Sequence, residues 1–223
     1  DEGFHPARSL VSKDGGEGTA STADLLRDEG AISGRAGGAP ALYFRAVFPK
    51  KGLTAVCGVI HGYADHSGRY LHVMEEWAKR GIGSVAIDLR GHGKAEGPRG
   101  FGRSFDEFID DAGELSKLVE RRAEGAPHFL MGHSFGGLVS TMATLQDPRS
   151  YRALLLSGPF FGLAMKVPAI KIQVGKLASK LMPRLRLPSG LSGKDVTHDA
   201  ERARAYDTDP LVFKEATARW FTE

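Results

Sequence analysis

Short apolar runs bounded by turn residues recur along the middle of the chain. They are residues 41–48, 54–60, 84–87, 127–131 and 153–157. Runs without polar alternation, such as 54–60, are typical of strands covered on both faces of a sheet. The run 41–48 ends at Pro49 and therefore predicts a strand near the edge of the sheet.

The stretches between these runs carry apolar residues at helical spacing. The predicted helices cover about 70–78, 105–119 and 135–145. Gly81 closes the first helix, and Ser104 with Glu107 forms a capping-box pair before the second. Because strands and helices alternate, the sequence predicts an α/β fold with a mostly parallel sheet and flanking helices.

The regular alternation of predicted strands and helices stops towards both ends of the chain. Residues 1–29 show no periodic apolar pattern, so we expect a poorly ordered N-terminal arm. Residues 30–158 form the predicted core, and 159–208 an inserted helical cap over the carboxyl ends of the strands. Residues 209–223, beginning at Asp209-Pro210, are expected to return to the core.

Composition narrows the function class. The 223 residues suit one domain with an insertion, and 30 Lys and Arg against 27 Asp and Glu give a net charge of +3. This mild excess, without a basic-aromatic cluster, does not indicate a nucleic-acid partner. The lone Cys57 lies in an apolar run, so neither a disulfide framework nor a thiolate metal site is expected. The chain shows no run of membrane-spanning length, and Asp1 at its start indicates an earlier boundary or processing event.

The segment Gly132-His133-Ser134-Phe135-Gly136 lies between a predicted strand and a predicted helix. This order predicts a nucleophile elbow, a strained turn that exposes a serine hydroxyl. Gly132 and Gly136 are expected because neighbouring backbone comes too close for a Cβ atom. The alternative is a glycine-rich turn that only packs a helix on a sheet.

An activated serine attacks an ester carbonyl and creates an oxyanion, which backbone N–H groups stabilise. The amides of Phe135, after the nucleophile, and Tyr63, in the loop after strand 54–60, are the predicted donors. Gly62 lets that loop turn, while His61 is expected to brace it rather than act as a base. We expect His133 to pack beside the nucleophile.

A second loop, Gly91-His92-Gly93, follows strand 84–87. We expect His92 to fix this loop by hydrogen bonds. A phosphate cradle is the alternative, although no helix of suitable spacing starts at Gly93. The sequence shows no metal-ligand set or cofactor fingerprint, and serine hydrolase chemistry needs neither.

Four stretches together carry a family resemblance: 61–70, 88–93, 132–137 and 209–212. From about Gly30 to Glu223 the chain resembles the monoacylglycerol lipase and lysophospholipase group of α/β-hydrolases. The resemblance implies a serine ester hydrolase with the α/β-hydrolase fold that acts on single-chain lipid esters. Three residues depart from the group: Tyr63 replaces a smaller residue, Asp65 its usual Glu, and Ala95 a common Ser.

The triad of this fold follows the order serine, acid, histidine, but only His198 follows Ser134 among the histidines. His198 lies in the predicted cap, and the resemblance places the family's Asp and His after the last cap helix. We therefore expect the chain to hold the first two thirds of a hydrolase, with the rest missing or on another chain. Alone, it should turn over little substrate and leave a sheet edge uncovered.

The predicted cap combines apolar and basic residues, with no acidic residue between Asp147 and Asp195. Its apolar residues, expected to line an acyl pocket, are Phe160, Phe161, Leu163, Met165, Val167, Ile170, Val174 and Leu177. Its lysines suit transient contact with an anionic membrane or micelle surface. The alternative is a cap whose apolar face packs on the core and whose lysines are only solvated.

Three functions are consistent with these features. The first is hydrolysis of monoacylglycerols or lysophospholipids through an acyl-enzyme on Ser134. A soluble carboxylesterase or aminopeptidase on the same scaffold is the second, and a non-catalytic binding protein with this fold the third. The expected location is cytoplasmic or peripheral to a membrane surface.

Overall fold

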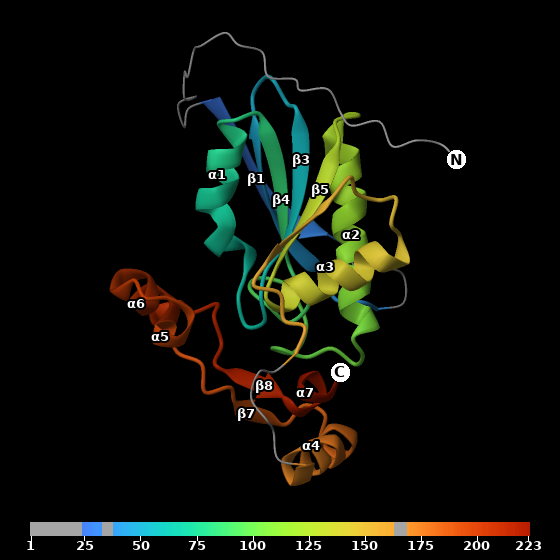
Figure 1. The fold of residues 1–223 in the computed structure, drawn as a ribbon, viewed down its shortest axis with the longest axis vertical. Helices are drawn as coiled ribbons and strands as arrows, with labels where there is room; N and C mark the ends of the chain where they lie inside the picture. The colour runs from blue at the N-terminus through green and yellow to red at the C-terminus, as the bar shows by residue number, and fades with distance from the viewer. Residues whose placement is uncertain (1–23, 33–37, 163–168) are drawn as a thin grey trace, which may run out of the picture.

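The computed structural model of the chain describes residues 24–32, 38–162 and 169–223. A sheet with the strand order β1-β2-β4-β3-β5-β6 forms its centre (Figure 1). The strands are β1 (Leu25–Ile32), β2 (Leu42–Pro49), β3 (Ala55–Ile60), β4 (Ile82–Asp88), β5 (His128–His133) and β6 (Leu154–Ser157). Strands β3 to β6 run parallel, whereas β1 and β2 pair antiparallel, so the predicted mostly parallel α/β sheet is confirmed.

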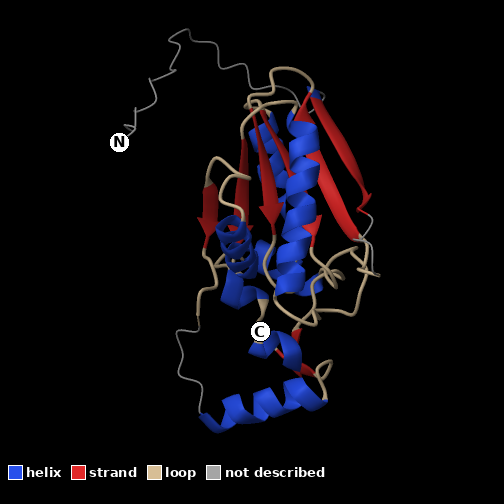
Figure 2. Cartoon of the chain, turned by 90° about the vertical axis from the view of Figure 1, so that its right-hand side faces the viewer, coloured by secondary structure: helices blue, strands red, loops and turns tan. Residues whose placement is uncertain are grey.

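Helices cover both faces of this sheet (Figures 1 and 2). The helices around the sheet are η2 (Ser67–Tyr70, a 3₁₀ turn), α1 (Leu71–Ala78), α2 (Asp106–Ala123) and α3 (Phe135–Gln146). Val56 of β3 packs in one apolar cluster with Leu115 of α2, while the next residue, Cys57, packs with Met74 of α1. Alternate residues of a strand point to opposite faces, so the continuous apolar run of β3 is buried on both sides.

The register of the central strands places three loops at one edge of the sheet. Ile60 of β3 lies level with Ile87 of β4 and with Gly132 of β5. The chain therefore leaves these three neighbouring strands at the same height. In parallel α/β sheets this carboxyl edge is where ligands bind.

Strand β1 corrects the predicted N-terminal arm. Residues 1–23 lie outside the described residues, but 25–29 belong to a strand that pairs with β2 from Leu25↔Pro49 to Ile32↔Leu42. Most of its side chains are exposed, so main-chain pairing rather than apolar burial defines the strand. Arg27 adds an ion pair with Glu75 of α1 at 2.9 Å.

The predicted capping box at Ser104 and Glu107 is wrong. Helix α2 begins at Asp106, and its N-terminus has no side-chain cap. The Glu107 carboxylate instead accepts the Arg103 amide N–H at 2.8 Å and pairs with Arg90 at 3.0 Å. Two arginines therefore hold the carboxylate away from the N-cap amide.

The cap is not purely helical. It contains α4 (Ala169–Leu181), β7 (Arg186–Pro188), α5 (Gly193–Val196) and α6 (Ala200–Thr208), and it is followed by β8 (Glu215–Thr217) and α7 (Ala218–Thr222). Strand β8 pairs antiparallel with β7, and Thr222 of α7 donates to Ser179 of α4 at 2.7 Å. Residues 215–222, expected to return to the core, thus pair with the cap below the sheet (Figure 1), and Trp220 among them also packs against the core cluster.

One edge of the sheet carries exposed leucines. Among the described residues, β6 pairs only with β5. Leu155 is 44% exposed and Leu156 41%, while Leu145 near the end of α3 is 68% exposed. The strand and the helix that follows Ser134 are thus open on this side, as the sequence predicts.

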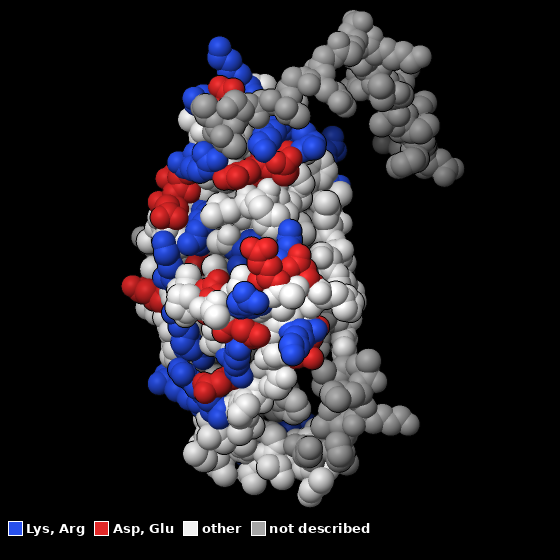
Figure 3. Space-filling model, turned by 90° about the vertical axis from the view of Figure 1, so that its left-hand side faces the viewer, with Lys and Arg blue, Asp and Glu red and all other residues white. Residues whose placement is uncertain are grey.

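Charged side chains of both signs are interspersed over the side of the molecule that carries α1 (Figure 3). That side shows no continuous basic surface among the described residues. No helix in the described ranges has the length and hydropathy needed to cross a lipid bilayer.

Candidate active site

Ser134 occupies a strained turn between β5 and α3. Its φ of 51° and ψ of −119° lie in a region that L-residues rarely adopt, which is how a nucleophile elbow projects its side chain. Ser134 is half-buried rather than packed inside the sheet. The backbone therefore has the predicted elbow geometry.

The two glycines of the elbow are required by close backbone contacts. A Cβ on Gly136 would collide with the carbonyl oxygens of Ile60 and His61, and one on Gly132 with the carbonyl of Gly136. The first turn of α3 thus lies directly against the end of β3. This contact brings the loop after β3 beside the serine.

Gly62 marks the point where that loop meets Ser134. A Cβ on Gly62 would lie 3.3 Å from the Cβ of Ser134. Two amides flank this contact: Tyr63 follows Gly62, and Phe135 opens α3, where an N–H has no partner within the helix. Within the described part of the chain, the loop's hydrogen bonds include none donated by the Tyr63 amide. The oxyanion role of both amides stays a prediction.

His61 and His133 both make backbone contacts at the strand ends. His61 is fully buried, donates from Nδ1 to the Gly62 carbonyl at 2.6 Å and accepts the Leu89 amide at Nε2 over 3.0 Å. His133 Nδ1 lies 2.9 Å from the Ser157 carbonyl. In the described residues no hydrogen bond joins either ring to the Ser134 hydroxyl. Burial lowers the pKa of His61, which suits a neutral brace and not a base.

The loop after β4 is organised by His92 and by a carboxylate that the sequence pattern did not single out. His92 is buried and donates from Nδ1 to the Arg90 carbonyl at 2.9 Å. The buried Asp88 accepts the Ser67 amide at 2.6 Å and the Lys94 amide at 2.8 Å. A Cβ on Gly93 would collide with the Asp88 carboxylate, so a phosphate there would meet a negative charge. The arrangement favours the loop-fixing role over the phosphate cradle.

Asp88 is held in its charged form. Burial alone would raise the pKa of this carboxyl, but the hydrogen bonds from Ser67 and Lys94 contribute to holding it below its ordinary value. Asp88 thereby connects the loops that follow β3 and β4. Its place at the start of the stretch 88–93 was a usable signal for a positioning role.

The residues expected to line an acyl pocket do not converge. Phe160 is half-buried, and its amide N–H donates to the Ser134 carbonyl at 2.9 Å. Phe161 is 60% exposed. The described residues do not include Leu163, Met165 and Val167. Ile170, Val174 and Leu177 are 70%, 60% and 58% exposed. α4 turns its opposite side, with Gly175 and Ser179, towards α7, so these three side chains face solvent and their role in an acyl pocket stays a prediction.

The apolar side of α4 is not packed on the core in the described residues, so the alternative reading of the cap finds no support at this helix. His198, the one histidine that follows Ser134 in the sequence, lies exposed between α5 and α6.

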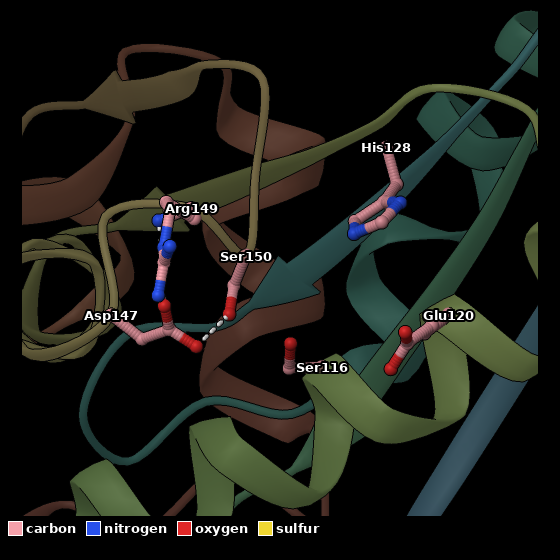
Figure 4. Close-up of a pocket in the computed structure, with 6 residues that line it drawn as sticks. All are labelled: Ser116, Glu120, His128, Asp147, Arg149 and Ser150. Atoms are coloured by element: carbon pink, nitrogen blue, oxygen red, sulfur yellow. Dashed lines mark hydrogen bonds between the residues drawn. The ribbon is translucent and has the colours of Figure 1, made fainter.

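A separate polar cavity of about 340 Å³ lies at the other end of β5 (Figure 4). It is lined by Ser116, Glu120, His128, Asp147, Arg149 and Ser150. His128 begins β5 and Ser134 follows its end, so at about 3.3 Å per residue the two lie about 20 Å apart. This cavity is therefore not part of the serine site.

Comparison with known families identifies the scaffold. The family model described as "Serine aminopeptidase, S33" (Hydrolase_4) matches residues 52–223. The chain belongs to this family. The S33 match begins just before β3 and includes both the Ser134 elbow and the cap.

Curated relatives carry lipase names. The chain is 34% identical over 152 residues to the monoacylglycerol lipase of Mycolicibacterium smegmatis, covering 68% of this chain and 54% of the relative. It is 35% identical over 172 residues to phospholipase YtpA of Bacillus subtilis, covering 76% and 65%. The chain thus spans about half to two thirds of the length of these curated relatives.

A solved structure agrees with the fold. The monoacylglycerol lipase of Paleococcus ferrophilus matches with a TM-score of 0.70 and 28% identity, over 81% of this chain and 67% of that one. The α/β-hydrolase fold and the similarity of this S33 family member to monoacylglycerol lipases and a phospholipase are therefore confirmed.

Proposed function

We propose that the full-length protein is a serine hydrolase that cleaves single-chain lipid esters, such as monoacylglycerols or lysophospholipids. The observation that carries the proposal is the strained turn at Ser134, which lies against Gly62 at the carboxyl edge of the sheet. An exposed serine beside main-chain amides suits acyl transfer from carboxylic esters or amides, and the lipase names of the relatives favour esters.

The proposed reaction has two steps. A histidine takes the proton of the Ser134 hydroxyl as its oxygen attacks the ester carbonyl, and the amides of Tyr63 and Phe135 stabilise the resulting oxyanion. The C–O bond to the alcohol breaks, the alcohol leaves with the proton from the histidine, and the acyl group stays on Ser134. Water then releases the fatty acid by the reverse proton transfers.

The triad histidine and its acidic partner belong, in this proposal, to polypeptide beyond residues 1–223. Two observations support this. The described histidines near Ser134 are occupied by backbone contacts, and β6 with α3 leaves Leu145, Leu155 and Leu156 open to solvent. Further strands beside β6 would cover these leucines and bring new side chains to the carboxyl edge.

A lipid substrate is favoured by the cap and by the relatives. One side of α4 exposes Ile170, Val174, Leu177 and Leu181, an apolar surface that monomeric proteins rarely leave free. We propose that this surface rests on a membrane or micelle, where the substrate resides, with Lys176 and Lys180 on the same exposed helix meeting anionic headgroups. The similarity to relatives named monoacylglycerol lipase and phospholipase also favours a lipid substrate. A peripheral or cytoplasmic location is proposed with it.

The experiment is activity-based labelling combined with a substrate panel. The full-length protein and its Ser134→Ala variant are treated with a fluorophosphonate probe, and then offered a monoacylglycerol, a lysophospholipid, a short soluble ester and an aminoacyl amide. We expect labelling only with Ser134 present and fastest turnover of a lipid ester. Equal rates on the short ester would favour a soluble carboxylesterase, and cleavage of the amide an aminopeptidase. An unlabelled wild-type protein would favour a non-catalytic binding protein.

A further inference from the structure

The loop after β3 is held from outside by a segment that follows the cap. We call residues 61–68 the oxyanion loop and residues 209–220 the return segment. The two meet at three points: His66 with Asp209, Ala64 with Phe213, and Tyr63 with Trp220. These contacts join parts of the chain that are separated by the whole cap.

The His66–Asp209 contact joins a buried histidine to a half-buried carboxylate by a hydrogen bond. His66 Nδ1 accepts the amide N–H of Gly68 at 3.2 Å, so its proton is on Nε2, which donates to Asp209 Oδ2 at 2.9 Å. Asp209 Oδ1 accepts the Leu211 amide at 2.9 Å. Burial alone would raise the pKa of Asp209, yet the hydrogen bonds from His66 and Leu211 help to keep it below its ordinary value.

The Tyr63 ring is fixed by aromatic and polar contacts. It stacks on Trp220 with ring centroids 3.8 Å apart and meets the edge of Phe213 at 5.4 Å. Its hydroxyl donates to the Gly100 carbonyl at 3.0 Å, and Thr217 of the return segment donates to the same carbonyl at 2.9 Å. The residue whose amide faces the oxyanion in the proposed reaction thus has its side chain bound to the return segment.

Ala64, between these two contacts, has a φ of 61°. A left-handed conformation at a residue with a Cβ persists only where its surroundings determine it. Here the Ala64 carbonyl accepts the Phe213 amide N–H at 3.4 Å, while Tyr63 before it stacks on Trp220 and His66, two residues after it, bonds Asp209. The loop shape needed at Gly62 and Tyr63 therefore depends on residues 209–220.

We propose that the return segment positions the oxyanion hole: Asp209, through His66, and Trp220, through the Tyr63 ring, set the orientation of the Tyr63 amide. They are positioning residues that do not touch substrate. This inference rests on the proposed hydrolase function and adds to it a coupling between the cap and the reacting site. If the cap moved away from the core, the return segment would move with it. The Tyr63 amide would then lose the orientation needed to donate to the oxyanion.

Asp209→Asn in the full-length protein is the sharpest test. Asparagine has one acceptor oxygen for two donors, the Leu211 amide and His66 Nε2, and the other histidine tautomer would oppose the Gly68 N–H. We expect kcat on a soluble short ester to fall about 10- to 100-fold, with KM changed less than about twofold, because the lost interaction acts in the transition state. Glu201→Gln, which removes an exposed charge on α6, is the matched control and should keep both constants.

Further variants separate a change in loop position from a general loss of folding. Trp220→Ala should lower kcat in the same way, and Trp220→Phe, which keeps a stacking ring, should restore most of it. Combining Asp209→Asn with His66→Ala should cost no more than the worse single change, since both act through one contact.

Hydrogen–deuterium exchange of the peptide containing residues 61–68 gives a readout independent of turnover. Faster exchange there in Asp209→Asn and Trp220→Ala, but not in Glu201→Gln, supports the inference even if the wild-type protein hydrolyses no ester and the proposed function fails. Unchanged kcat and unchanged exchange in both variants would overturn it. A lower melting temperature with kcat intact would overturn it too, since that result reports only a structural role.

Discussion

His61 accepts the amide N–H of Leu89 at Nε2 over 3.0 Å, at the point where β3 and β4 end side by side. The other ring nitrogen donates to the Gly62 carbonyl at 2.6 Å. With one nitrogen donating and the other accepting, the ring is neutral and both its positions are used. His61 therefore links the loops that follow β3 and β4, and neither of its ring nitrogens is free to act as a base.

Stability should fall on mild acidification because buried histidines resist protonation. Burial lowers the pKa of His61 and brings that of His92 to about 3, whereas an unfolded histidine titrates near 6.5. Below pH about 6.5 the unfolded chain therefore binds protons that the folded chain does not, which favours unfolding by up to about 1.4 kcal/mol per pH unit for each histidine. Urea unfolding of the full-length protein at pH 7.5, 6 and 5 measures this.

His92→Asn should remove that residue's share of the pH dependence, because the asparagine amide can still donate to the Arg90 carbonyl. His72→Asn, at an exposed position, is the control and should leave the slope unchanged. A stability that is flat between pH 7.5 and 5 in the wild-type protein would contradict the neutral assignment.

Ser134→Gly should unfold less readily than Ser134→Ala. Both changes remove the hydroxyl, but only glycine adopts a φ of 51° without strain. We expect a difference of about 1 kcal/mol in the free energy of unfolding, measured in urea. Equal stabilities would show that the turn is relaxed, and would weaken the case for a nucleophile elbow.

Gly136 and Gly113 should respond in opposite ways to alanine. A Cβ on Gly136 would strike the carbonyl oxygens of Ile60 and His61, whereas one on Gly113 in α2 meets nothing within 4 Å. Gly136→Ala should destabilise the fold by at least about 3 kcal/mol, because backbone cannot move aside. Gly113→Ala should stabilise α2 by about 0.5–1 kcal/mol. Thermal and urea unfolding of the pair checks both signs.

Charges on the exposed side of α4 should weaken attachment to lipid. The double change Val174→Asp and Leu177→Asp replaces two side chains that are 60% and 58% exposed. Since burying each aliphatic side chain in lipid contributes about 1.5–3 kcal/mol, sedimentation with phosphatidylglycerol vesicles should show at least about tenfold weaker binding. Val196→Asp on α5 is the control. Hydrolysis of a soluble ester should be unchanged, and a double variant that still binds vesicles fully would exclude α4 as the contact.

The features that sequence predicted best have local causes. The elbow was found because a tight turn needs glycines at fixed positions around Ser134, and the structure shows the contacts that exclude a Cβ. The strands at 54–60 and 84–87 were found because burial on both faces requires an uninterrupted apolar run. His61 was expected to brace its loop, and its ring nitrogens bond the Gly62 carbonyl and the Leu89 amide.

The features that sequence missed depend on distant partners. Strand β1 has charged residues at 27–29 and no alternation, and becomes a strand because β2 offers main-chain groups to pair with. The three residues of β8 form a strand only beside β7. His66 and Asp209 are 143 positions apart, so no local pattern joins them. The one available signal was that both lie in the stretches shared with the lipase group.

The stacking of Trp220 on Tyr63 also gives the molecule an optical reporter. The chain has two tryptophans, and the other, Trp77, lies in α1 on the opposite face of the sheet. Changing Trp77 to phenylalanine leaves a single indole whose emission depends on its contact with the tyrosine ring. Stopped-flow fluorescence of that protein would record, during mixing with lipid, the moments at which the loop beside Ser134 is assembled and released.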